Sequence, residues 1–133
     1  MYIQSIKETI PIVTPHGEVI HELIGRTVAN PTERHSVAYI ILSPGKASLL
    51  HYHPEAEESY FILQGKAHFL LGNEEAILVP GQAVLITSSQ PHKITSIGET
   101  DLVFLAVCVP AWEPTNTEFL ERPSDLVSGC ADA

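Results

Sequence analysis

The sequence has only two cysteines among its 133 residues, Cys108 and Cys130. Two cysteines in such separate positions do not make a disulfide framework, so we expect a protein of a reducing compartment. Cys108 lies in an apolar run and is expected in the core. Cys130 lies in a polar tail and is expected to be a free thiol.

Long hydrophobic runs are also missing. No apolar stretch reaches the length of a membrane span, because Gly, Pro or charged residues interrupt each one. The first residues, "MYIQSIKETIPIV", lack the basic start and continuous apolar segment of a signal peptide. We therefore expect a cytoplasmic protein without a membrane partner.

Positive charge is scarce as well. Seven Lys and Arg residues stand against sixteen Asp and Glu residues, which gives a net charge of -9. Binding to nucleic acid or to an anionic membrane surface needs a basic patch, so neither is an expected partner. Solubility is the simplest interpretation of the acidity.

Short segments typical of β-strands recur along much of the sequence. Apolar residues account for 44% of the chain, enough for one compact domain with a real core. Runs rich in Val, Ile, Leu, Phe and Tyr alternate with turns at Pro and Gly, which is typical of an all-β sandwich or barrel. The expected strands are residues 36–43, 48–53, 58–64, 67–71, 76–80, 83–87, 92–97 and 102–109.

The two ends of the chain are harder to interpret. The segment "HGEVIHELIGRT" predicts either a strand or an arm, because its apolar and polar residues alternate only in places. The segment "TNTEFLERP" predicts one or two helical turns or none, because Pro123 would end a helix early.

Histidines and a carboxylate are concentrated in "GKASLLHYHPEAEESYFILQG". Side chains alternate between the faces of a strand, so His51 and His53 share a face, and Glu58 could join them from the next strand. Glu57 is a less favoured alternative, since it points to the other face. A fourth ligand has to come from later in the chain, where His92 follows a turn. Imidazole nitrogens and one carboxylate oxygen suit Mn, Fe, Ni, Co, Cu or Zn better than Ca or Mg.

At these residues the sequence resembles the cupin superfamily of small double-stranded β-helix barrels. The first cupin motif is Gly, five residues, His-x-His, three or four residues, Glu, six residues and Gly. It is matched at every spacing by Gly45, His51, His53, Glu58 and Gly65. The resemblance covers about residues 36–110.

The second cupin motif is present but eroded. Gly81 and His92 match it, eleven positions apart. Thr87, Ser89 and Ser96 stand where the family often has Pro, Gly and Asn. These are mainly turn and support positions, so their change leaves metal binding intact in principle.

The resemblance implies one divalent transition metal per chain (Mn, Fe, Ni or Zn) near the mouth of the barrel. Its implied ligands are His51, His53, Glu58 and His92. The resemblance favours an enzyme of dioxygenase, decarboxylase, lyase or isomerase type that acts on a small organic molecule. Glu58 and Tyr60 are the candidate catalytic residues, Glu58 as a base and Tyr60 as a holder of a substrate oxygen.

Three alternatives stay open at this point. The protein could bind a small molecule or sugar through the metal without catalysis, or have a structural or storage role. The four residues could also remain in a barrel that no longer binds metal. For an enzyme or a binding protein we expect an apolar cavity lined by residues such as Leu50, Tyr60, Ile62 and Leu85.

Several other residues carry weaker signals. His68 could line the cavity, but a surface or partly buried position is favoured. His16, His21 and His35 are interpreted as ordinary polar residues of the arm, and Trp112 as a packing residue after the last strand.

The whole chain is expected to be one cupin domain. A jelly-roll-like antiparallel barrel at about residues 36–110 would follow an N-terminal arm (1–35) and precede a short C-terminal tail (111–133). An open sheet edge needs cover, so we expect a homodimer formed through the arm, Met1 to Arg26.

Overall fold

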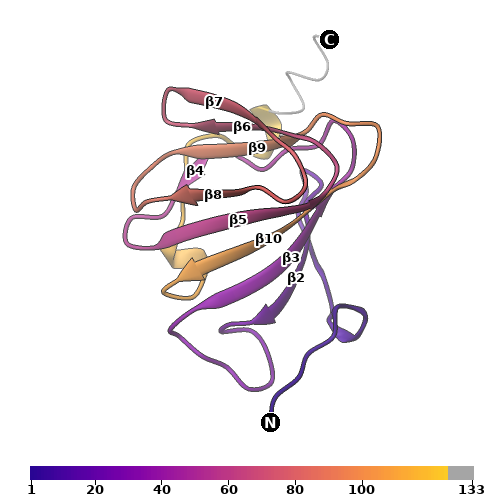
Figure 1. Cartoon of the computed structure of the whole chain (residues 1–133). Helices are drawn as coiled ribbons and strands as arrows, with labels where there is room; N and C mark the ends of the chain where they lie inside the picture. Colours follow the sequence, from indigo (N-terminus) through magenta and orange to yellow (C-terminus); the bar gives the residue numbers. More distant parts are fainter. Residues whose placement is uncertain (126–133) are drawn as a thin grey trace.

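Two antiparallel β-sheets form the framework of the computed structural model, which describes residues 1–125 (Figure 1). The strands are β1 (Ile12–Val13), β2 (Val19–Ile24), β3 (Ser36–Leu42), β4 (His51–Tyr52), β5 (Glu57–Gln64), β6 (Ala67–Leu71), β7 (Glu74–Leu78), β8 (Ala83–Ile86), β9 (His92–Ser96), β10 (Leu102–Val109) and β11 (Glu118–Phe119). Two 3-10 turns accompany them, η1 (Ile6–Glu8) and η2 (Pro114–Asn116). The expected all-β cupin architecture is confirmed.

The sheets differ in size and composition. One has six strands in the order β1-β2-β3-β10-β5-β8, and the other has five in the order β11-β4-β9-β6-β7. Neighbours in each sheet are often distant in the chain, as with β3 and β10, which pair over seven positions. Such crossed connections place strands from the first and last thirds of the sequence side by side.

The core lies between the two sheets. Strand β5 shows the alternation that builds it, with Glu58, Tyr60 and Ile62 buried and Phe61 and Leu63 exposed. Fully buried side chains from both sheets complete this core: Leu42, Ile62, Ile94, Leu102 and Phe104. The same alternation that places apolar residues inside therefore places Glu58 inside.

The segment expected as a strand at residues 48–53 is shorter than predicted. Only His51–Tyr52 is a strand, and the segment before it mixes backbone and side-chain partners. Ile94 N–H donates to Ser48 Oγ at 3.1 Å, and Leu50 N–H donates to the Glu121 carboxylate at 2.8 Å. The backbone therefore has partners outside the regular ladder.

Both chain ends contribute to the sheets. β2 pairs with β3 in the same chain, so the six-stranded sheet extends beyond the expected start of the barrel at residue 36. The segment at residues 115–123, for which one or two helical turns or none were expected, contributes to η2 and then forms β11, where Phe119 pairs with His51. No helix within residues 1–125 is long and apolar enough to span a membrane.

Candidate metal centre

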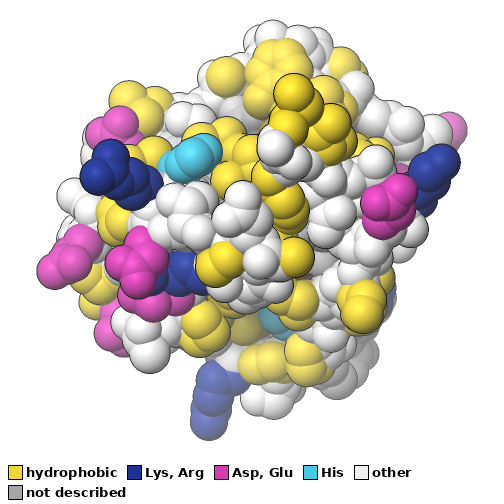
Figure 2. Space-filling model, turned by 90° about the horizontal axis from the view of Figure 1, so that it is seen from below, with side chains coloured by type: hydrophobic (Ala, Val, Ile, Leu, Met, Phe, Trp, Pro, Cys, Tyr) yellow, Lys and Arg dark blue, Asp and Glu magenta, His cyan; other side chains and the backbone are white. Residues whose placement is uncertain are grey.

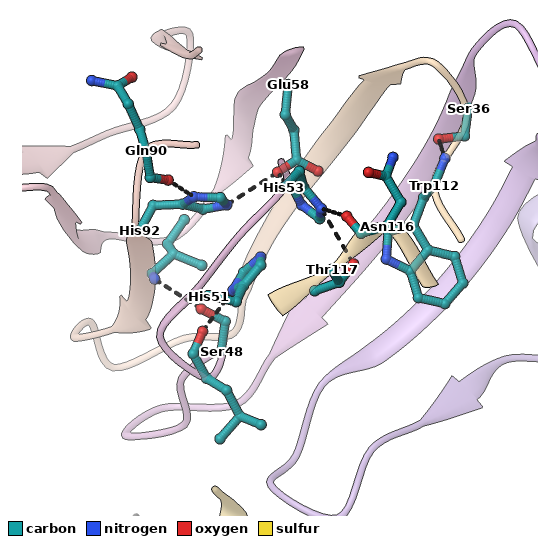
Figure 3. A network of polar contacts seen from close by, with 12 residues as sticks. Ser36, Ser48, His51, His53, Glu58, Gln90, His92, Trp112, Asn116 and Thr117 are labelled. Carbon is teal, nitrogen blue, oxygen red and sulfur yellow. Dashed lines mark hydrogen bonds and ion pairs between the residues drawn. The ribbon is translucent and has the colours of Figure 1, made fainter. Parts of the chain in front are cut away.

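Four side chains from three strands and one connection converge inside the fold. His51 lies in β4, His53 follows it, Glu58 lies in β5, and His92 begins β9 directly opposite His51. One ligand atom from each lies within 4.8 Å of the others. Figure 3 shows the rings of His53 and His92 turned toward the Glu58 carboxylate. The group predicted from the motif could therefore hold one metal ion.

Backbone carbonyls fix the orientation of all three imidazoles. Nδ1 of each ring bonds to a carbonyl oxygen: His51 to Leu49 at 2.7 Å, His53 to Asn116 at 3.0 Å and His92 to Gln90 at 2.9 Å. A carbonyl oxygen only accepts, so each Nδ1 carries the proton and donates it. In the neutral rings Nε2 then holds a free lone pair, the usual state of a metal-binding histidine with a carbonyl partner.

The contacts of Glu58 leave room for a proton or a cation to be shared at the centre of the group. Its Oε1 lies 3.2 Å from His92 Nε2 and 3.3 Å from His53 Nε2. His53 Nε2 is buried and has no hydrogen-bond partner among the described residues. Lone-pair atoms this close repel one another unless a shared proton or a metal ion lies between them. The donor set therefore suits a transition metal.

Burial and close contacts shift the pKa values of the site in different directions, and for His53 burial is outweighed by the contact with Glu58, which raises the pKa. Burial alone would raise the pKa of Glu58, but contacts with His53 and then His92 lower it to about 2. Burial, followed by the charge of His92, lowers the pKa of His51 to about 4. At neutral pH the site thus holds an ionised carboxylate and a neutral His51, the forms that bind metal ions.

A cavity of about 230 Å³ adjoins the group. Its wall includes His51, His53 and Glu58, and no Lys or Arg is among the described residues that line it. Apolar side chains form much of the remaining wall: Ile12, Ile20, Ala38, Ile40, Ala106, Trp112 and Phe119. The cavity is therefore suited to a small molecule with a largely apolar body.

Of the four residues expected to line the cavity, only Tyr60 does so. Ile62 has the same parity but is fully buried in the core, and Leu85 is 55% exposed on the outer side of β8. Leu50 also lies outside the cavity wall. The prediction failed for Ile62 because parity sets the face of a sheet, not the position along the barrel axis, and for Leu85 because its side chain points to the outer face.

Tyr60 is held in an aromatic group beside the metal ligands. Its ring lies 4.8 Å from that of Phe104 and 6.0 Å from that of His92, between centroids. Burial, and then the charges of Glu58 and Glu18, raise the pKa of Tyr60 well above its usual value of 10. Its hydroxyl therefore stays protonated and can donate a hydrogen bond.

The turn before His92 has a left-handed residue, although the sequence has Ser and not Gly at this position. Ser89 has a φ of +66°, the left-handed conformation for which the family often uses Gly. Its N–H donates to His53 O at 2.7 Å, and its hydroxyl donates to Pro54 O at 3.1 Å. This turn thereby connects two of the metal-ligand segments.

The remaining predictions have mixed outcomes. His68 is partly exposed outside the cavity wall, with Nε2 3.3 Å from Glu75 Oε1, in the partly buried position that was favoured. Cys108 is buried as expected, and burial raises the pKa of its thiol to about 12, whereas Cys130 lies outside the described residues. Trp112 lines the cavity in addition to packing, and its backbone N–H donates to Ser36 Oγ at 3.0 Å (Figure 3).

The interpretation of His16 as an ordinary polar residue is wrong. Its side chain is only 7% exposed, lines the cavity, and lies 2.6 Å from the Glu18 carboxylate. No local pattern indicated this position, because it depends on how β2 pairs with β3. His21 bonds to Thr9 outside the cavity wall, and His35 is exposed.

Comparison with known proteins agrees with the fold. The family model described as a cupin domain matches residues 38–108. Over 111 residues the chain is 34% identical to Uncharacterized protein MJ1618 of Methanocaldococcus jannaschii, covering 84% of this chain and 88% of that protein.

Two solved structures have the same fold. A structure described as a predicted oxalate decarboxylase from Thermotoga maritima is 26% identical with a TM-score of 0.71, covering 82% of this chain and 99% of that one. The polyketide cyclase RemF from Streptomyces resistomycificus is 18% identical with a TM-score of 0.77, covering 98% of this chain and 93% of that one. Because the family match spans more than half of the chain, this protein belongs to the cupin family.

Proposed function

We propose that this protein is a metal-dependent enzyme that acts on a small organic molecule at a centre of three histidines and one glutamate. The observation that carries the proposal is the convergence of Glu58 and three imidazoles beside a cavity. We further propose His51, His53, Glu58 and His92 as the ligands of one Mn, Fe, Ni or Zn ion per chain.

The residues around the ion have distinct proposed roles. A bound divalent ion would act as a Lewis acid toward a substrate oxygen. Glu58 reduces the net charge of the centre, and the carbonyl-bonded histidines hold its geometry. The Tyr60 hydroxyl donates a hydrogen bond to a substrate oxygen in the cavity, and the apolar wall excludes water.

The cavity wall supports a substrate of low charge. A dianion such as oxalate, which the description of the Thermotoga structure names, meets no Lys or Arg among the described lining residues. Glu18 and Glu22 add negative charge to the wall. We therefore favour a neutral, partly apolar molecule.

Metal content tests the site directly. We expect about one ion per chain in the purified protein by elemental analysis, and almost none in His51→Ala or His92→Ala. His68→Ala is the matched control, because this histidine lies at the surface and should keep the full metal content. One ion per chain in both of the first two variants would contradict the assignment.

A turnover assay separates an enzyme from a binding protein. Iron-loaded protein is mixed with phenolic or diketone compounds in an oxygen electrode, and zinc-loaded protein with the same compounds is followed by chromatography. Consumption of oxygen or of the compound supports an enzyme, and binding without turnover of any compound supports non-catalytic binding.

We also propose that the protein is a homodimer. Large apolar side chains near the N-terminus are exposed, with Ile3 at 75%, Ile10 at 93% and Val13 at 66%. Figure 2 shows the molecule from below, with hydrophobic side chains spread across this face and most charged ones toward its edges. Apolar surface at a sheet edge is a common site of self-association.

A further inference from the structure

A second pair of titratable groups lies in the cavity wall, apart from the four metal ligands. His16 and Glu18 belong to the hairpin that joins β1 to β2, and His16 Nε2 lies 2.6 Å from Glu18 Oε1. The two side chains are only 7% and 16% exposed. Burial of an imidazole and a carboxylate in an apolar wall is costly unless the pair has a partner or a purpose.

The contact with Glu18 determines which nitrogen of His16 is free. An ionised carboxylate only accepts, so Nε2 of His16 must be the donor, and Nδ1 of the neutral ring keeps a lone pair. Nδ1 is buried and has no hydrogen-bond partner among the described residues. An imidazole held by a carboxylate at one nitrogen, with a free lone pair at the other, is suited to accept a proton.

The hairpin holds this pair in a fixed position. Thr14 N–H donates to Glu18 O, and Glu18 N–H donates to Thr14 Oγ1, both at 2.9 Å. Gly17 has a φ of +110°, and a Cβ there would lie 3.0 Å from Lys46 Cδ, so the tip packs closely against the loop before β4. The imidazole is therefore pre-positioned, as a proton-transfer group requires.

We propose that His16, oriented by Glu18, accepts a proton from a hydroxyl group of the substrate in this cavity. The inference rests on the proposed function and extends it to a class of substrate: an uncharged, largely apolar molecule with a phenolic or enolic hydroxyl. The substrate O–H bond breaks, its electron pair stays on the oxygen, and an Nδ1–H bond forms. Glu18 stabilises the positive charge of the ring until the proton returns to the product.

The first test follows the imidazole itself in the zinc-loaded full-length protein. Long-range ¹H–¹⁵N NMR should show His16 protonated at Nε2 and unprotonated at Nδ1. Phenol should shift the Nδ1 resonance toward the protonated value, and toluene, its hydroxyl-free counterpart, should not. An Nδ1 that is protonated in the free protein, or that does not respond to phenol, would overturn the proposal.

Variants test the same point through affinity. His16→Phe should weaken phenol binding about tenfold, the loss of one buried hydrogen bond, and leave toluene binding and zinc content unchanged. Glu18→Gln keeps the shape of the side chain but can donate to Nε2, so it should move the His16 proton to Nδ1 and weaken phenol binding similarly. His21→Phe is the matched control, because its ring bonds to Thr9 outside the cavity wall.

The outcomes separate this proposal from the metal site. Equal phenol affinity in the wild type and in both cavity variants means that the pair is only structural, or that a water molecule satisfies Nδ1, and overturns the inference. If His16→Phe does not fold, the NMR spectrum of Glu18→Gln decides, because the proposal requires the His16 proton to move to Nδ1 in this variant. Absence of zinc from the wild type refutes the proposed function instead, and the His16 spectrum of the metal-free protein still decides the tautomer.

Discussion

Glu58 and Glu57 are adjacent residues with opposite surroundings. Glu58 is buried against His53 and His92, whereas Glu57 is exposed on the other face of β5. Glu58→Gln removes the negative charge of the centre and leaves its shape, so we expect the metal affinity to fall at least about 100-fold. Glu57→Gln should leave it within about twofold. Competition with a chromophoric chelator measures both affinities.

The pair of variants also decides between the two glutamates as ligand. An equal loss of affinity in both would mean that the effect is one of overall charge. A larger loss in Glu57→Gln would require β5 to be shifted by one residue relative to its neighbours.

At this scale the sequence predicted that four side chains meet, but it did not predict most of the cavity wall. His51, His53 and Glu58 were predictable because strand alternation and one short connection decide how they lie. His16 was not, because its burial depends on the pairing of β2 with β3 and on the close approach of Gly17 to Lys46. Contacts between distant segments leave no periodic pattern in the sequence.

Among the elements, the turn between β5 and β6 has the strictest requirement for glycine. Gly65 has a φ of +86°, and a Cβ there would lie 2.6 Å from Asp101 O. Gly45, the other glycine of the motif, has a φ of +85° but nothing within 4 Å of its Cβ position. The two positions thus share a backbone conformation and differ only in the space around them.

Alanine substitutions should separate these two effects. Gly45→Ala carries only the backbone cost of about 1–2 kcal/mol. Gly65→Ala adds a clash with backbone, and we expect a further loss of about 1–3 kcal/mol in the free energy of unfolding. Urea denaturation of both variants measures the difference. Equal losses of stability in the two variants would contradict this expectation, because the backbone at Gly65 and Asp101 would then move apart at little cost.

The element boundaries show where local patterns stop being informative. Most expected strands are present because their alternation coincides with burial, as in β5 and β9. β4 was overestimated because the Glu121 carboxylate, from the far end of the chain, accepts from Leu50 N–H just before it. β11 was missed because a two-residue strand has no period of its own and depends on β4 as a partner.

For the whole molecule, metal binding should stabilise the fold. The centre joins β4, β5 and β9, which belong to both sheets, so an ion held there stabilises the native state relative to the unfolded chain. At a free metal concentration of 100 times the Kd the gain is about 2.7 kcal/mol. For a domain of this size we expect that removal of the metal lowers the Tm by roughly 5–15 °C.

Differential scanning fluorimetry with and without EDTA measures this shift. Re-addition of zinc should restore the original Tm. His92→Ala is the control, because without the site its Tm should not respond to either treatment. An equal response of the variant and the wild type would place the stabilising ion elsewhere.

The exposed apolar N-terminal segment predicts the assembly state. β1 lies at the edge of the six-stranded sheet, where a second copy could cover Ile10 and Val13. We expect light scattering to give twice the 14.5 kDa mass of the chain for the wild type and a single chain mass for Ile10→Asp combined with Val13→Asp. Leu85→Asp is the matched control, since Leu85 is 55% exposed in β8 at the opposite edge of that sheet. A monomeric wild type would refute the dimer. Dissociation by Leu85→Asp alone would show that the dimer forms through the β8 edge and not through the β1 edge.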